Sequence, residues 1–170
     1  MSSKQKRLVD LEHGSLRRFS AWPDTDCPRV AAGVYTIWRG PQLLFVGMSD
    51  RGLTRRNLEM SRNLGRTVGL WSRLDAHASG RRSGDHLRDY LDFLVLEGLS
   101  VDQIERVAAG ELRFDDLVRA FIGSELTYRY VITEDGEAAF ALERDVRCGA
   151  LGCGRPHVNP LRARTSPTEC

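Results

Sequence analysis

The chain has 170 residues and a net charge of +2; 41% of its residues are hydrophobic and 28% are charged. These values are typical of one globular domain, residues 1–170, which buries about 68–70% of its unfolded surface. No apolar run approaches the ~18 residues of a membrane span, and residues 1–14 lack the apolar core of a signal peptide. We therefore expect a cytoplasmic protein that has no membrane partner and whose cysteines are reduced.

The charges are unevenly distributed along the chain. Residues 51–88 contain nine arginines and three acidic residues, whereas residues 89–125 contain nine acidic residues and three arginines. A basic stretch of this kind attracts the phosphate backbone of nucleic acids. The alternative is a solvated arginine-rich surface that balances the acidic half.

The first third of the chain predicts a β-hairpin. Residues 1–29 form a lead-in with one short helix and a turn that contains two prolines. Residues 34–38 and 43–46 are rich in β-branched, aromatic and aliphatic side chains, and a short Gly/Pro loop separates them. The polar residues 48–69 then favour a loop or an irregular helix.

The rest of the chain predicts helices and a third strand. Helical spacing of apolar residues indicates helices within residues 70–79, 83–98, 101–110 and 113–123. Residues 126–133 alternate with period two, as a strand does, and residues 137–148 form a last helix before a loose tail at 161–170.

These elements predict an α/β (α+β) fold with a small, mainly antiparallel three-stranded sheet flanked by helices. A hairpin is not stable alone, so the third strand is expected to join it. We found no internal repeat and no linker that would divide the chain into two domains.

Two tripeptides of the hairpin, GVY at residues 33–35 and FVG at residues 45–47, resemble the motifs of the GIY-YIG nucleases. The resemblance continues with Arg73 and His77 on a following helix, Glu143 on a later helix, and Asn159 in the segment RPHVNP. These motifs span residues 33–159, in the order of the family. The chain is therefore identified as a member of the GIY-YIG nuclease superfamily by resemblance.

The resemblance implies a metal-dependent endonuclease that hydrolyses phosphodiester bonds of DNA, most naturally duplex DNA. It implies that Tyr35 activates a water, that Arg73 holds a phosphate oxygen, and that His77 orients one of the reacting groups. Glu143 would bind one Mg²⁺ or Mn²⁺, and Asn159 would support the site. Oxygen ligands suit these ions, which keep several waters and bind phosphate directly.

Three further motif residues of the hairpin are expected to support the Tyr35 side chain: Gly33, Phe45 and Gly47. The glycines would let the backbone turn or approach closely without a Cβ. Phe45 departs from the family, which has a second tyrosine there. Loss of a hydroxyl that positions phosphate or water would slow the reaction by about 10²–10³, by analogy with one lost oxyanion donor.

The arginines expected to contact DNA are Arg51, Arg55, Arg56, Arg81 and Arg82.

Several alternatives remain open. Without catalysis, the chain would be a nucleic-acid-binding module of the same fold; a protein-binding domain that uses the acidic residues 89–125 is a third class. A zinc site at Cys148, Cys153 and His157 is disfavoured because the spacing differs from the usual C-x₂-C.

Overall fold

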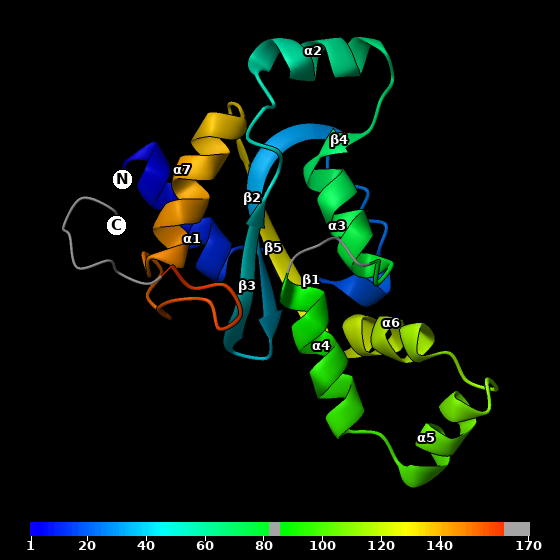
Figure 1. Ribbon diagram of the computed structural model, residues 1–170. Helices are drawn as coiled ribbons and strands as arrows, with labels where there is room; N and C mark the ends of the chain where they lie inside the picture. Colours follow the sequence, from blue (N-terminus) through cyan, green and yellow to red (C-terminus); the bar gives the residue numbers. More distant parts are fainter. Residues whose placement is uncertain (82–85, 162–170) are drawn as a thin grey trace.

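The computed structural model describes residues 1–81 and 86–161 and has the expected mixed α+β fold (Figure 1). Three long strands form the centre of an antiparallel sheet: β2 (Val30–Arg39), β3 (Gln42–Met48) and β5 (Leu126–Thr133). The strand order is β1-β5-β2-β3, so β2 lies between its hairpin partner and the third strand, and β3 is an edge strand. The predicted hairpin and third strand are therefore confirmed.

Two very short strands extend this sheet. β1 (Arg17–Arg18) pairs with β5 in antiparallel orientation, and β4 (Val68–Gly69) pairs with the start of β2 in parallel orientation. Neither was predicted, because two residues are too short to show an alternating pattern. Each of the two strands attaches to the sheet a segment whose sequence predicts a loop.

Alternating side chains of β2 divide the core into two layers. Tyr35 and Ile37 point to the face covered by α3 (Leu70–Ala78), α4 (His86–Glu97) and α6 (Phe114–Glu125). Val34 and Trp38 point to the opposite face, against α1 (Ser3–His13) and α7 (Gly136–Arg147). Figure 1 shows α1 and α7 together on one side of the sheet and α3 on the other. Any site that uses α3 and α7 must therefore lie where the two faces meet.

The predicted lead-in, residues 1–29, is an integral part of the fold. Helix α1 buries Leu8 and Leu11, and the 3₁₀ helix η1 (Phe19–Ala21) buries Phe19. The buried Thr36 hydroxyl donates a hydrogen bond to the carbonyl of Leu11 at 3.0 Å. This bond fastens α1 to the central strand.

Residues 49–69 contain α2 (Arg55–Asn63), which agrees with the expected irregular helix. Thr54 caps its first turn by accepting from the amide of Asn57 at 3.2 Å. Figure 1 shows α2 at the end of the sheet where β2 begins. The helix therefore stands apart from both core layers.

Helices α4 and α6, with α5 (Val101–Ala108) between them, form an extension from the sheet (Figure 1). The buried Arg88 guanidinium anchors this extension, because it donates to the Gly80 carbonyl and to carboxylates of Asp92 and Asp115. Helix α5 contributes no buried residue and projects furthest from the sheet. The predicted Ser/Asp start of the helix at residues 83–98 lies outside the described residues, as does most of the predicted tail.

Helix α7 begins at the predicted position because the Asp135 carboxylate accepts from the Ala138 amide at 2.9 Å. It ends before Gly149, which has a φ of 97°. Within the described residues, no helix is both long and apolar enough to span a membrane. Cys27 and Cys153 are free cysteines, whereas Cys148 is disulfide-bonded, so the expectation of a reduced thiol is wrong at that position.

Thr36→Val is expected to destabilise the protein although it preserves side-chain shape. The Thr36 hydroxyl donates to Leu11 and accepts from the indole N–H of Trp38 at 2.9 Å, so valine leaves two buried polar groups unpaired. We expect a loss of about 1–3 kcal/mol in the free energy of unfolding, measured by urea denaturation. Thr25→Val, at an exposed position, is the control and should change little. Equal stability of the two variants would contradict this account of α1 docking.

Candidate active site

The Tyr35 side chain lies directly across Gly47 of the neighbouring strand. The two residues are register partners in the β2–β3 pair. A Cβ placed on Gly47 would lie 2.3 Å from the Tyr35 hydroxyl oxygen and 2.9 Å from the Phe45 ring. The second motif therefore ends in glycine because the phenol of the first motif occupies the space of a side chain.

The Tyr35 hydroxyl is hydrogen-bonded to Nε2 of His77 at 2.7 Å. Helix α3 supplies this histidine, because Leu70 and Leu74 anchor the inward surface of the helix and His77 follows one turn later. The imidazole also contacts the Phe45 ring edge-on, with centroids 5.8 Å apart. Tyr35 and His77 are 2% and 7% exposed, so this pair lies in a dry environment.

Arg73 precedes His77 by four residues, so the two side chains lie on the same flank of α3. Unlike His77, Arg73 is exposed. None of the described residues forms a hydrogen bond or an ion pair with its guanidinium. The helix thus presents an exposed cation one turn from the buried Tyr35–His77 pair.

Glu143 lies on α7, on the opposite face of the sheet from His77, and is 7% exposed. Its Oε1 accepts from Nη1 of Arg147 at 3.2 Å. Burial raises the pKa of the Glu143 carboxyl, and the Arg147 charge and hydrogen bond oppose this shift. Because the folded pKa is raised, this group favours folding at low pH, and that contribution is lost as the pH rises through the folded pKa. Burial thus disfavours the ionised carboxylate, and a cation beside Glu143 would offset this free-energy cost.

The Asn159 side chain pairs with the free edge of β3 as a strand backbone would. Its Nδ2 donates to the Val46 carbonyl at 2.7 Å, and its Oδ1 accepts from the Val46 amide at 3.2 Å. The amides of His157 and Val158 donate to the carbonyls of Leu43 and Leu44. Asn159 therefore fixes the carboxy-terminal segment to the hairpin, which is a supporting position.

Arg147 connects Asn159 to Glu143. Its Nε donates to the Asn159 carbonyl at 2.9 Å while its Nη1 donates to Glu143. A continuous chain of contacts thus runs from the Glu143 carboxylate to Val46, which lies between Phe45 and Gly47. Sequence reasoning missed Arg147, although its i,i+4 spacing from Glu143 was a usable signal.

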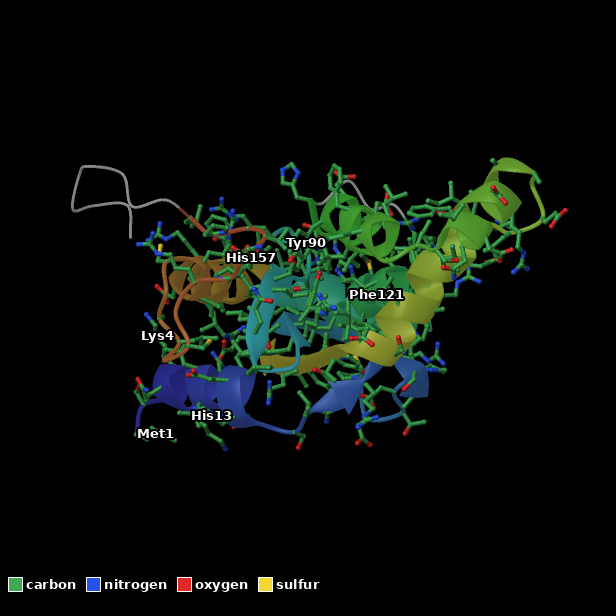
Figure 2. All side chains as sticks on the ribbon, turned by 90° about the horizontal axis from the view of Figure 1, so that it is seen from below. Met1, Lys4, His13, Tyr90, Phe121 and His157 are labelled. Carbon is green, nitrogen blue, oxygen red and sulfur yellow. The ribbon has the colours of Figure 1, made fainter. Side chains whose placement is uncertain are left out.

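Helix α4 also touches this segment. The rings of Tyr90 and His157 meet edge-to-face, with centroids 5.2 Å apart. Figure 2 shows these two labelled side chains next to each other, where α4 approaches the carboxy-terminal segment. His157 is thus engaged in packing between two elements.

Gly33 has a different role from Gly47. Its Cβ would lie 2.2 Å from the Val131 carbonyl oxygen and 2.5 Å from a methyl of Leu70. Ser49 holds the same residue, because its hydroxyl accepts from the Gly33 amide and its amide donates to the Gly33 carbonyl. Gly33 therefore allows α3 to approach the sheet, and it positions Tyr35 and His77 through that approach.

The arginines predicted to bind DNA occupy unequal environments. Arg51 pairs with Glu137 at 2.7 Å, Arg81 with Asp75 at 2.7 Å, and Arg55 with Asp135 at 3.9 Å. Arg56 is exposed without a charged partner among the described residues, and Arg82 lies outside them. Three of the five predicted arginines thus lie within 4 Å of a carboxylate.

The described residues contain no group of three or more His, Cys, Asp or Glu side chains that could hold a metal ion. Cys148 is disulfide-bonded, so its thiolate is not available to the disfavoured zinc site. Glu143 is a single carboxylate, so it fits a metal that keeps its waters and takes further ligands from a substrate phosphate. Weak binding in the absence of substrate is the expected consequence.

The structure thus brings the predicted residues together in two groups. Tyr35, Phe45, Gly47 and His77 form one group, with Arg73 on its exposed flank. Glu143 and Asn159 form the other through Arg147, and the backbone of Val46 joins the two at the β3 edge. Comparisons with models of known families, with curated proteins and with solved structures found no match to this chain.

Gly47→Ala is expected to destabilise the hairpin, because the new methyl overlaps the Tyr35 phenol. Overpacking of this kind costs about 1–3 kcal/mol in the free energy of unfolding. Gly98→Ala is the matched control, because its Cβ would meet neighbours no closer than 3.7 Å. In a Tyr35→Ala background the cost of Gly47→Ala should fall. If the cost is the same in both backgrounds, the phenol is not the cause.

Asn159→Ala is expected to free the Val46 amide. The variant loses both side-chain bonds to the β3 edge, so this amide should exchange its hydrogen with solvent faster, by about 10-fold for each 1.4 kcal/mol lost. Hydrogen-exchange NMR measures the effect. Asn63→Ala, at the exposed end of α2, should leave that amide unchanged. An unaltered Val46 amide in Asn159→Ala would refute the supporting role.

Proposed function

We propose that this protein is a metal-dependent endonuclease, similar to the GIY-YIG nucleases, which hydrolyses phosphodiester bonds of DNA. The observation that carries the proposal is the 2.7 Å contact between the Tyr35 hydroxyl and His77 Nε2, above Gly47 and beside the exposed Arg73. Residues from three separate sequence motifs meet there. We also propose a cytoplasmic location.

The first chemical requirement is a base for the attacking water. A free tyrosine has a pKa near 10, so about one in a thousand is ionised at pH 7. When His77 Nε2 is unprotonated, it can take the phenolic proton, and the phenolate oxygen can then take a proton from the water. The water oxygen attacks phosphorus, the bond to the leaving oxygen breaks, that oxygen takes a proton from solvent, and His77 returns its proton to solvent.

The second requirement is positive charge at the phosphate. Arg73 fits it because a guanidinium stays charged and donates two parallel hydrogen bonds to phosphate oxygens. Because its guanidinium pairs with no side chain in residues 1–81 and 86–161, it would need no partner exchange with these residues before it binds. It would hold the non-bridging oxygens on which charge develops.

A divalent metal bound to Glu143 would supply further charge neutralisation at the phosphate. In this protein, Arg147 fixes the Glu143 carboxylate, and Asn159 fixes the segment that Arg147 contacts. Arg147 and Asn159 are therefore positioning residues. The ionised form of Glu143, which burial disfavours, is the form that binds a cation.

A catalytically inactive nucleic-acid-binding module is the second candidate. Two observations favour it. Tyr35 is 2% exposed, so a phosphodiester can reach the phenol only after neighbouring groups move apart, and Phe45 supplies no hydroxyl. For an enzyme, the missing hydroxyl is expected to lower the rate by about 10²–10³.

Nicking of supercoiled plasmid in the presence of Mg²⁺ or Mn²⁺ separates the two candidates. We expect slow nicking by the wild-type protein and none with EDTA. Tyr35→Phe, Arg73→Ala and Glu143→Gln should each reduce the rate by at least about 10²-fold. Tyr35→Phe is the sharpest of these, because it keeps the ring above Gly47 and removes the hydroxyl alone.

The matched controls are Arg106→Ala and Glu97→Gln, which remove an exposed arginine and an exposed glutamate from the α4–α6 extension. Both should nick at the wild-type rate when purified in the same way. Nicking that is equal in all variants would indicate a contaminating nuclease and contradict the proposal. Binding of plasmid without nicking would favour the second candidate.

A further inference from the structure

A groove at the α2 end of the sheet is lined by three arginines that belong to none of the sequence motifs. Its lining is formed by Pro28, Arg29, Val30, Arg62, Gly65 and Arg66, around a volume of about 400 Å³. Arg29 immediately precedes β2, Arg62 lies in the last turn of α2, and Arg66 lies between α2 and β4. Figure 1 shows these elements close together at one end of the molecule.

The groove differs in charge from the arginines predicted to bind DNA. Arg29, Arg62 and Arg66 are all exposed, and none of them forms an ion pair with any residue in the described ranges. The groove lining named above contains no carboxylate. By contrast, Arg51 and Arg81 each have a carboxylate oxygen at 2.7 Å. The groove is therefore one place in the described structure where positive charge remains available to a ligand.

The backbone around the groove is fixed. The Arg66 amide donates to the Ser61 carbonyl at 2.9 Å and the Gly65 amide donates to the Arg62 carbonyl at 3.1 Å. With a φ of 62° at Gly65, these bonds form a Schellman motif that ends α2. This motif holds Arg62 and Arg66 on the two sides of one tight turn.

Arg29 is held independently. Its carbonyl accepts from the Val68 amide at 2.8 Å, and its guanidinium carbon lies 4.7 Å from the centroid of the Trp71 ring. Stacking on an indole orients the guanidinium and leaves its N–H groups free to donate. Positive charge at a helix C-terminus explains Arg62 in part, but it does not explain Arg29.

We propose that this groove binds the phosphate backbone of duplex DNA. Three separated cations around an open groove match a polyanion, whose binding releases counterions with each phosphate neutralised. Trp71, on whose ring the Arg29 guanidinium stacks, is two residues from Arg73 on α3. Helix α3 thus links the groove to Arg73, although residues two apart on a helix point to different sides, so the two would contact separate phosphates of one duplex. This choice of ligand rests on the proposed function.

Fluorescence anisotropy with a labelled 20-base-pair duplex in EDTA tests the groove without cleavage. The groove variant combines Arg29→Gln, Arg62→Gln and Arg66→Gln. We expect its affinity to fall by about 10- to 100-fold, and the slope of log K against log salt to decrease by about 2–3. Circular dichroism and thermal unfolding should match the wild type, since all three side chains are exposed.

The matched control combines Arg18→Gln, Arg106→Gln and Arg144→Gln, three exposed arginines outside the groove, with the same change in net charge. It should lose little affinity. An equal loss in both triple variants would show that net charge alone governs binding, and would overturn the proposal. Absence of duplex binding by the wild-type protein would overturn it too.

Two further readouts separate this proposal from its alternatives. If the groove variant loses binding to phosphatidylserine vesicles but keeps duplex binding, the groove is a membrane-surface site and the proposal is wrong. If plasmid nicking is intact in the groove variant, the proposed function stands and the groove proposal falls. If the wild type binds duplex through the groove but does not nick, the groove proposal stands and catalysis falls.

Discussion

The contact of the Tyr35 phenol with Gly47 and His77 is the constraint on which the rest of the candidate site depends. It joins the hairpin to α3 through one buried side chain, and it requires a glycine on one strand and a histidine on the helix. A buried hydroxyl without a partner would be costly, so the hydrogen bond fixes the rotation and depth of α3. Arg73 takes its position from that placement.

The residues on the two faces of the sheet are connected through its outer strand, β3. Helix α3 covers one face and α7 covers the other, so groups on these helices can act together at the β3 edge. The backbone of Val46 lies between Phe45 and Gly47, and its amide and carbonyl bind Asn159. Arg147 then extends the contact to Glu143. The site is therefore arranged around an edge, with each half packed in a different layer of the core.

The hairpin, the third strand and the main helices could be predicted, because their apolar periodicity reflects burial directly. The family pattern indicates Tyr35 and His77 separately, but not that they hydrogen-bond, and the overlap of the phenol with Gly47 depends on strand register. Arg147 and Arg29 escaped prediction for a different reason, and Arg62 and Arg66 were not distinguished from the other arginines of residues 51–88. A sequence does not show which of many arginines folding leaves without a carboxylate, and local density along the chain favoured Arg51 and Arg81 instead.

The docking of residues 157–159 along β3 also affects how molecules of this protein behave toward one another. An uncovered outer strand presents a row of amide and carbonyl groups to which a strand from another molecule can add. Here the amides of His157 and Val158 and the carboxamide of Asn159 occupy carbonyls of that row. The same segment that supports the candidate site thereby protects the hairpin from self-association, so one short stretch of chain serves both the site and the solubility of the fold.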